Sequence, residues 1–460
     1  MKISFHGADR DVTGSCHLLE AAGKRILIDC GLYQGSRELD VENGASFDFE
    51  ADAIDFLLLT HAHLDHCGRI PLLVKRGFKG EIVTTAPTRE LAKLVMLDAA
   101  RLQDEDAQHA SRHGAHPHAD ASQPLYTELD AFRAMDCFGR VACYGEAVEL
   151  APGLTATFYD AGHILGSASI RVVESGADGT RSIVFSGDLG NGGHPILRDP
   201  QPPPHADAVV METTYGDRLH KGIGPSVEEL YAAIEDTRRR GGNVVIPTFA
   251  LERAQELLYY LREGVERGRL PRDLPVFLDS PMAISATEIF RRHPDFWVAK
   301  DRTLFAEGHD PFALPGLRFT RESSDSRAIN DTTGGAVIMA GSGMCTGGRV
   351  RHHLSHNLGR ADSSVVFVGY AAAGTLARQL IDGAKSVRLF HEQVPVRARL
   401  HTINGFSAHA DQNGLLAWHG AIQPAKTILV HGDDAVMRRF AQKLHGSEVL
   451  MPALGDSYAL

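Results

Sequence analysis

Four side chains that can bind a metal stand within six consecutive positions of the sequence: His61, His63, Asp65 and His66. They follow the apolar run 56–59. Burying unpaired imidazoles and carboxylates costs on the order of several kcal/mol, so such a cluster beside an apolar strand indicates a metal site rather than a coincidental polar loop. The first two residues are spaced to converge on one zinc ion, and the last two turn toward a second.

Catalytic zinc keeps one position open for water and takes its other ligands from the protein, so each ion needs further residues from elsewhere in the chain. Three candidates stand just after predicted strands: His163, Asp188 and His431. Taken singly, each is equally consistent with an ordinary loop residue. Together they complete two zinc sites that share one carboxylate.

The elements that must position these residues are predicted from hydrophobic patterning. Apolar runs at 24–29 and 54–60 end in polar residues, as buried strands do when they deliver side chains at their carboxyl ends. Further strands are predicted at 154–160, 168–173 and 182–186. From about residue 215 onward, strands alternate with helices, which predicts a parallel sheet. The predicted helices there are 226–240, 250–262 and 282–292.

The bulk composition is that of a soluble globular protein, with 43% hydrophobic and 23% charged residues among 460. The N-terminus lacks the apolar run of a signal peptide, and no stretch approaches the roughly 20 apolar residues of a membrane helix. We therefore expect a cytoplasmic protein with no membrane association. The net charge of −11, from 47 basic and 58 acidic residues, means that a nucleic acid would have to bind in a locally basic groove.

The HxHxDH run, followed far along the chain by a His, an Asp and a His, resembles the metallo-β-lactamase fold, an αββα sandwich with metals at one sheet edge. The resemblance implies two zinc ions per chain with these ligands: His61, His63 and His163 on the first, Asp65, His66 and His431 on the second, and Asp188 on both. It also implies that Asp29 supports the ligand shell without binding metal.

A second resemblance concerns the region beyond Asp188. Glu212 ends an apolar strand, and His409 lies in the run 405–411 before His431. This series of an acid and two histidines resembles motifs A, B and C of the β-CASP group, the nucleic-acid-processing branch of the fold. The resemblance implies an α/β protein in which the sandwich occupies residues 1–215 and 391–460. A doubly wound α/β β-CASP domain is then inserted at residues 216–390.

The match extends to three further stretches, at 247–257, 341–349 and 369–378. Gly-rich turns after strands expose backbone N–H groups that suit phosphate, and arginines there can form charge-assisted bonds to RNA. The substrate-binding candidates are Arg253, Ser342, Arg349, Thr375 and Arg378. For each arginine a surface salt bridge is an equally good interpretation. The chain departs from the family pattern at Cys67, Glu252 and Ala377, of which Glu252 bears on substrate preference.

The resemblance implies a zinc-dependent ribonuclease that hydrolyses single-stranded RNA and leaves 5′-phosphate and 3′-hydroxyl ends. We expect His409 to protonate the leaving O3′, while Glu212 orients it and raises its pKa. Asp65 and Asp29 complete the predicted catalytic set. A homodimer is implied by the family resemblance alone.

Three alternatives remain at this point. A lactonase-like small-molecule hydrolase would keep the zinc ligands but has no need of the inserted domain or His409. A non-catalytic RNA-binding scaffold predicts lost ligands, yet every expected ligand is present. DNA as the substrate is open because no feature of the sequence reads the 2′-hydroxyl. The sequence also leaves open endonuclease or exonuclease action, and manganese in place of zinc.

Overall fold

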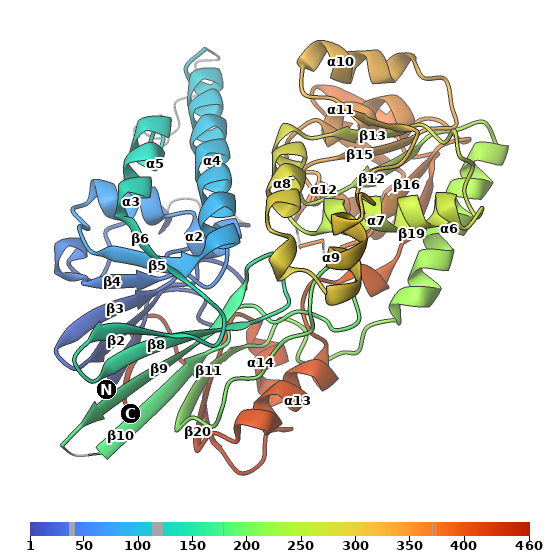
Figure 1. The fold of residues 1–460 in the computed structure, drawn as a ribbon. Helices are drawn as coiled ribbons and strands as arrows, with labels where there is room; N and C mark the ends of the chain where they lie inside the picture. Colours follow the sequence, from blue (N-terminus) through green and yellow to red (C-terminus); the bar gives the residue numbers. More distant parts are fainter. Residues whose placement is uncertain (36–41, 113–122, 178, 370, 373) are drawn as a thin grey trace. The chain divides into compact units, whose positions relative to one another are not determined.

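The computed structural model describes residues 1–35, 42–112, 123–177, 179–369, 371–372 and 374–460, without the side chains of 109–112. The chain divides into two compact units (Figure 1). Unit 1 comprises residues 1–192, 198–219 and 409–460, and unit 2 comprises residues 193–197 and 220–408. The chain therefore leaves unit 1, builds unit 2 and returns, which is the topology of an inserted domain.

Unit 1 is built on two seven-stranded sheets in the described part of the chain. The first has the strand order β22 (Ser457–Ala459), β1 (Lys2–Phe5), β2 (His17–Ala21), β3 (Lys24–Ile28), β4 (Phe56–Leu58), β5 (Glu81–Thr85) and β6 (Phe138–Ala142). The second has the order β21 (Glu448–Leu450), β20 (Lys426–Val430), β11 (Ala208–Glu212), β10 (Gly179–Phe185), β9 (Ala168–Gly176), β8 (Leu154–Asp160) and β7 (Ala147–Ala151).

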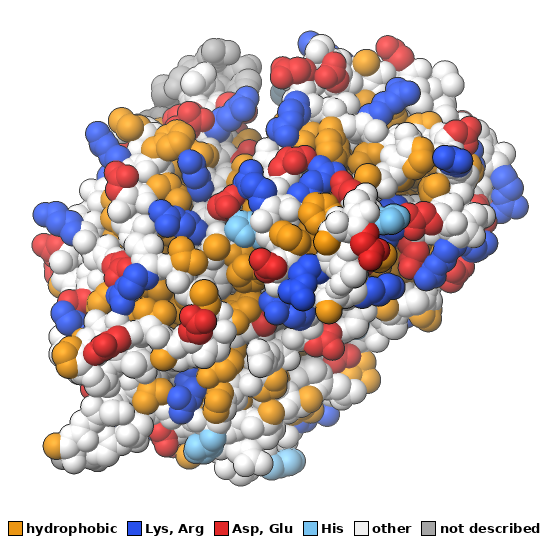
Figure 2. All heavy atoms as spheres, viewed as in Figure 1, with side chains coloured by type: hydrophobic (Ala, Val, Ile, Leu, Met, Phe, Trp, Pro, Cys, Tyr) orange, Lys and Arg blue, Asp and Glu red, His pale blue; other side chains and the backbone are white. Residues whose placement is uncertain are grey.

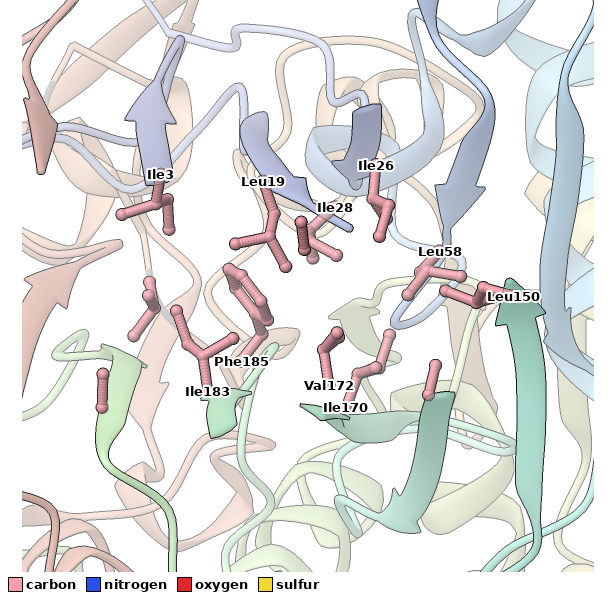
Figure 3. Packing of buried hydrophobic residues seen from close by; sticks show 14 of the residues in the cluster. Ile3, Leu19, Ile26, Ile28, Leu58, Leu150, Ile170, Val172, Ile183 and Phe185 are labelled. Carbon is pink, nitrogen blue, oxygen red and sulfur yellow. The ribbon is translucent and has the colours of Figure 1, made fainter. Parts of the chain in front are cut away.

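The two sheets of unit 1 pack face to face around one hydrophobic core. Successive side chains of a strand point to opposite faces, and burial along β8 alternates between buried and half-buried residues in the same way. In Figure 3, Ile28 and Leu58 of the first sheet face Ile170, Val172 and Phe185 of the second. Face-to-face packing of this kind forms a sandwich.

Helices cover the outer faces of the sandwich. On the first sheet, α4 (Ala86–Arg112) packs on β5 and β6 and against α5 (Glu128–Ala134), which also contacts α3 (Ile70–Lys75). On the second sheet, α13 (Gln412–Ile422) and α14 (Asp434–Ala441) share a buried cluster with β11 and β20. The αββα sandwich predicted from the sequence is therefore confirmed. Short elements complete the unit: α2 (Leu64–Cys67), η1 (Ala51–Ala53) and η3 (Met135–Cys137).

Unit 2 contains a six-stranded sheet in which all neighbouring strands are parallel. Its order is β14 (Leu317–Phe319), β13 (Val276–Asp279), β15 (Val337–Ala340), β12 (Val244–Pro247), β16 (Ser364–Phe367) and β19 (Arg399–Thr402). Between the strands lie α6 (Ile223–Arg239), α7 (Arg253–Glu266), α8 (Pro281–Arg292), α9 (Ala299–Ala306), α10 (Ser323–Ala328), α11 (Val350–Asn357) and α12 (Leu376–Ile381). The predicted doubly wound α/β region is confirmed.

Smaller elements fill the connections of unit 2. They are a hairpin of β17 (Ser386–Leu389) and β18 (Glu392–Pro395), and the 3-10 helices η4 (Pro294–Phe296), η5 (Ile329–Asp331) and η6 (Asn404–Phe406).

The limits of unit 2 differ from the predicted insert at 216–390. Residues 391–408 group with unit 2 because β19 pairs in register with β16 at the edge of its sheet. Residues 193–197 also group with it, since Ile196 O accepts a 2.7 Å hydrogen bond from Val298 N and Leu197 bridges to Trp297. These long-range pairings are not visible in local sequence patterns.

Among the described residues, no helix has both the length and the apolar character needed to cross a membrane.

The core between the sheets gives a stability prediction. Phe158 on β8 is fully buried in it, so Phe158→Ala should lower the free energy of unfolding by about 3–5 kcal/mol through lost contacts and a residual cavity. Chemical denaturation followed by circular dichroism measures the change. The matched control is Phe132→Ala on α5, where the side chain is 49% exposed and the expected loss is under about 0.5 kcal/mol. Equal losses for the two variants would contradict the assigned core.

Candidate metal centre

The loop after β4 supplies four of the polar side chains at the carboxyl edge of the first sheet. β4 lies between β3 and β5 in parallel register, so the chain leaves it at a fixed point. His61 follows in this loop, and His63 is the N-cap of α2 in an extended conformation. Asp65 and His66 then lie within α2 itself. The change from extended loop to helix turns the last two residues away from the first two.

A first cluster of donor atoms brings together His61, His63, His163 and Asp188. His63 Nδ1 lies 3.2 Å from His61 Nε2 and 3.1 Å from His163 Nε2. Asp188 Oδ2 lies 3.4 Å from His61 Nε2 and 3.5 Å from His163 Nε2. Ligand atoms around a tetrahedral zinc with bonds of about 2.0–2.1 Å are separated by about 3.3–3.4 Å. The observed spacings match the edges of such a tetrahedron.

A second cluster lies on the other side of Asp188. It contains Asp65, His66 and His431. His431 Nε2 is 3.4 Å from both His66 Nε2 and Asp65 Oδ2. Asp188 Oδ1 completes it, at 3.3 Å from His66 Nε2 and 3.5 Å from His431 Nδ1. The two oxygens of one carboxylate therefore face two different clusters, and together these contain all seven residues predicted as zinc ligands.

The chemistry of the donor set was compared with what a metal ion requires. Burial lowers the pKa of His61 to about 3 and of His63 to about 4, and also lowers that of His163, so these imidazoles are neutral, the form that binds metal. Asp188 is 2% exposed, and its Oδ1 accepts no hydrogen bond from the described residues. A buried carboxylate oxygen without a donor is costly. The two clusters therefore fit metal ions.

The charge of Asp188 dominates the electrostatics of the second cluster. Burial alone would raise the pKa of Asp188, but His431, His66 and His61 outweigh it and hold that pKa well below its usual range. Conversely, Asp188 and Asp29 overcome the effect of burial and raise the pKa of His66. The buried carboxylate thus attracts positive charge to its surroundings, and a bound cation would supply that charge directly.

Asp29 holds the loop and one of the ligand candidates in place. Its Oδ1 accepts a 2.8 Å bond from Thr60 N, and its Oδ2 accepts a 2.8 Å bond from Thr60 Oγ1. Oδ2 also lies 2.7 Å from His66 Nδ1. This contact fixes the ring of His66 so that Nε2 faces the second cluster. A similar device acts at His163, where Ser167 Oγ accepts bonds from the backbone N–H groups of His163 and Ile164 at 3.0 and 3.2 Å.

His409 and Glu212 form a pair beside the clusters. Glu212, at the end of β11, is fully buried, and its Oε1 accepts a 2.6 Å bond from Leu189 N and lies 3.2 Å from His409 Nδ1. The backbone of His409 bridges to Gly190. Its ring centroid is 4.5 Å from that of His163. Burial lowers the pKa of His409, but Glu212 and Asp188 reverse this effect and raise it to about 9.

The predicted substrate-binding residues all lie in unit 2, and the structure gives two of the arginines internal partners. Arg253 is buried on α7 and pairs with Glu256, which also contacts His194. Arg349 Nη1 donates to Asp279 Oδ1 at 2.7 Å. For these two arginines the structure therefore places the guanidinium in an ion pair.

The other three candidates differ among themselves. Arg378 pairs with Asp382 along α12 and is 37% exposed. Thr375 is the N-cap of α12, where its hydroxyl accepts a 3.2 Å bond from Arg378 N. Ser342 lies in the turn after β15, 3.3 Å from the hydroxyl of Thr346. Tyr370 and Ala373 of the same predicted stretch lie outside the described residues. On the face drawn in Figure 2, basic and acidic side chains are interspersed.

Sequence reasoning missed the buried network around Asp279. This carboxylate is fully buried at the end of β13. Besides Arg349, its oxygens accept bonds from Thr320 Oγ1 at 2.7 Å and Ser326 Oγ at 2.6 Å, and Oδ2 lies 2.7 Å from His353 Nε2. The available signal was the one that identified Asp29, Asp188 and Glu212, namely an acidic residue that directly ends an apolar strand.

Comparison with known families identifies three regions of the chain. Residues 9–136 match the metallo-beta-lactamase superfamily, residues 254–380 match the Beta-Casp domain, and residues 393–452 match the Zn-dependent metallo-hydrolase RNA specificity domain. These regions fall in the sandwich, in unit 2 and across the return to unit 1.

Relatives of known sequence match nearly the whole chain. Ribonuclease TTHA0252 of Thermus thermophilus is 40% identical over 99% of both chains. Transcription termination factor FttA of Methanocaldococcus jannaschii is 31% identical over 96% of this chain and 68% of its own length. Among solved structures, a protein of unknown function from Enterococcus faecalis covers 100% of this chain and 99% of its own, with a TM-score of 0.58 and 12% identity. That likeness concerns the fold alone.

The hydrogen bonds of Asp29 predict its importance for metal retention. Asp29→Asn places an amide where two acceptor oxygens now serve Thr60 and His66, so metal affinity should fall about tenfold to hundredfold. Elemental analysis after dialysis against graded chelator concentrations measures it. The control is Asp207→Asn, since Asp207 likewise accepts bonds from a backbone N–H and a hydroxyl, those of Ser182. Equal metal retention by both variants would contradict the positioning role.

Proposed function

The chain belongs to the β-CASP family of the metallo-β-lactamase superfamily, and on that premise we propose that it is a zinc-dependent ribonuclease acting on single-stranded RNA. The observation that carries the proposal is the single buried carboxylate of Asp188, whose two oxygens face two separate donor clusters beside the His409–Glu212 pair. A small-molecule hydrolase of the fold has no need of that pair. The name of the Thermus thermophilus relative, a ribonuclease, supports RNA as the substrate.

In this proposal the chain holds two zinc ions. His61, His63 and His163 would bind the first, Asp65, His66 and His431 the second, and Asp188 both. When bound, the ions supply a water of lowered pKa and neutralise negative charge at the scissile phosphate. Asp29 orients His66, and Ser167 fixes the loop that carries His163.

His409 supplies the proton that the leaving group requires. Glu212 accepts from Nδ1 of the ring, which leaves the Nε2 proton as the one to be transferred. As the oxygen of water adds to phosphorus, the P–O3′ bond breaks and O3′ takes that proton. The products then carry a 5′-phosphate and a 3′-hydroxyl. Because Glu212 raises the pKa of His409, the ring carries this proton at neutral pH.

The cellular setting belongs to the same proposal. A cytoplasmic location follows from the expectation drawn from the N-terminal sequence. The homodimer implied by the family resemblance stays a prediction.

The proposal is tested by a denaturing-gel time course on 5′-labelled single-stranded RNA and matched DNA, with metal content measured for every sample. We expect the unaltered chain to cut RNA. His63→Ala should lose both metal and activity, whereas His409→Ala should keep its metal and lose at least about a hundredfold in rate. Internal fragments would indicate an endonuclease, and progressive shortening an exonuclease.

Two results would contradict this assignment. If the metal-loaded chain cuts neither nucleic acid, the nuclease proposal fails, and lactone and thioester substrates come next. If it cuts DNA and leaves RNA intact, the fold and site stand but the substrate is wrong. A fully active His409→Ala variant would remove that residue from the mechanism.

The pairing of the arginines predicts two different mutant phenotypes. Arg349→Ala leaves Asp279 without its cation, so the free energy of unfolding should fall by about 3 kcal/mol. Arg378 is in an i,i+4 surface pair, so Arg378→Ala should cost under about 0.5 kcal/mol. If Arg378 contacts a phosphate, that variant should reduce the salt dependence of RNA affinity by a slope of about 0.7. Thermal unfolding and fluorescence anisotropy at several salt concentrations separate the two effects.

A further inference from the structure

Phe249 is an exposed aromatic residue directly after a buried strand of unit 2. It is 37% exposed, while the two residues before it, Pro247 and Thr248, are buried. Among the described residues only two other phenylalanines, Phe132 and Phe390, are exposed to this extent. Isolated exposed apolar residues are common, so exposure alone carries little weight. The surroundings of this ring are what distinguish it.

The ring of Phe249 rests on the backbone of glycine turns. A Cβ atom at Gly343 would lie 2.6 Å from Cδ2 and Cε2 of the ring, so only glycine allows this contact. A Cβ at Gly369 would lie 3.5 Å from Cε2. The backbone before the ring is also fixed, because Thr248 N donates a 3.0 Å bond to Ala340 O at the end of β15. The ring is therefore held by rigid backbone on one side while part of it remains open to solvent.

The topology of the sheet places this ring at a special point. β12 and β15 are neighbours, but the chain passes from β12 to β13 beyond β15, and from β15 to β16 beyond β12. Crossovers between parallel strands are right-handed, so two connections that run in opposite directions lie on opposite faces of the sheet. The carboxyl ends of β12 and β15 thus form a topological switch point, where open α/β sheets bind their ligands. Phe249 and Gly343 come from these two loops.

We propose that Phe249 is a stacking platform for one base of the single-stranded RNA substrate. This inference rests on the proposed function and names a binding contact for it. Base stacking on an aromatic ring tolerates any sequence and does not depend on charge. It suits a chain with a net charge of −11, in which Arg253 and Arg349 are held by internal carboxylates.

The test combines steady-state cleavage with a spectroscopic probe, both on the metal-loaded full chain. Phe249→Leu keeps an apolar side chain but removes the π face, so KM for RNA cleavage should rise about tenfold with kcat unchanged, which corresponds to about 1.4 kcal/mol. Phe249→Tyr should restore KM. Phe132→Leu, at an exposed phenylalanine of unit 1, should leave KM as it is.

The probe is a single-stranded RNA with 2-aminopurine at one position in each of a set of oligonucleotides, mixed with enzyme in a stopped-flow instrument. Stacking quenches this fluorophore, so one position should be quenched on binding to the unaltered chain and not on binding to Phe249→Leu. This readout does not require the variant alone to be interpretable, because the unaltered chain must itself show the quenching.

Each other outcome overturns a specific claim. If Phe249→Leu cuts RNA with unchanged KM and the same quenching, the stacking site is wrong and the proposed function stands. If that variant keeps its KM but sediments as a smaller species, the ring belongs to an interface between protein chains instead. If the unaltered chain neither cuts RNA nor quenches any probe, the proposed function fails and the stacking site fails with it.

Discussion

The constraint on which unit 1 depends is the burial of one charged carboxylate. Asp188 is 2% exposed, and a buried carboxylate is stable only if donors or cations compensate its charge. On the Oδ2 side the rings of His61 and His163 have lowered pKa values and carry no charge. On the Oδ1 side the carboxylate raises the pKa of His66 and His431. The site thus demands positive charge that its neutral rings do not provide, and a metal ion bound by those rings satisfies the demand.

A surrounding set of hydrogen bonds turns this demand into a defined geometry. Asp29 fixes Thr60 and one ring, Ser167 fixes the backbone at His163, and Glu212 holds both Leu189 N and the ring of His409. Most of these side chains lie at or just beyond the carboxyl end of a strand. The two sheets of the sandwich bring those ends to one edge, because their inner faces are joined by a single continuous core. The packing of the core therefore determines the positions of the donors.

Unit 2 shows the opposite solution to the same electrostatic problem. Asp279 is also fully buried at a strand end, but both of its oxygens are satisfied by the chain itself, through Arg349, Thr320, Ser326 and His353. No external cation is needed there. The comparison shows why an acidic residue at a strand end does not by itself mark a metal site. What matters is whether the chain supplies the compensating charge, and in unit 2 the exposed surface nearby is left to an aromatic ring, Phe249.

The sequence by itself determined the local features of this protein: the strands and helices, the HxHxDH cluster, and the polar residues that end apolar runs. Hydrophobic periodicity and strand-end position are local properties, and both fold units and the seven clustered donors were predictable from them. Only the tertiary structure decided which charges compensate one another. It committed Arg349 to Asp279 and Arg253 to Glu256, set the raised pKa of His409 through Glu212, and carried the inserted unit to residue 408 through the pairing of β19 with β16. Charge compensation and strand pairing depend on distances between residues that are far apart in the chain, and folding alone sets those distances.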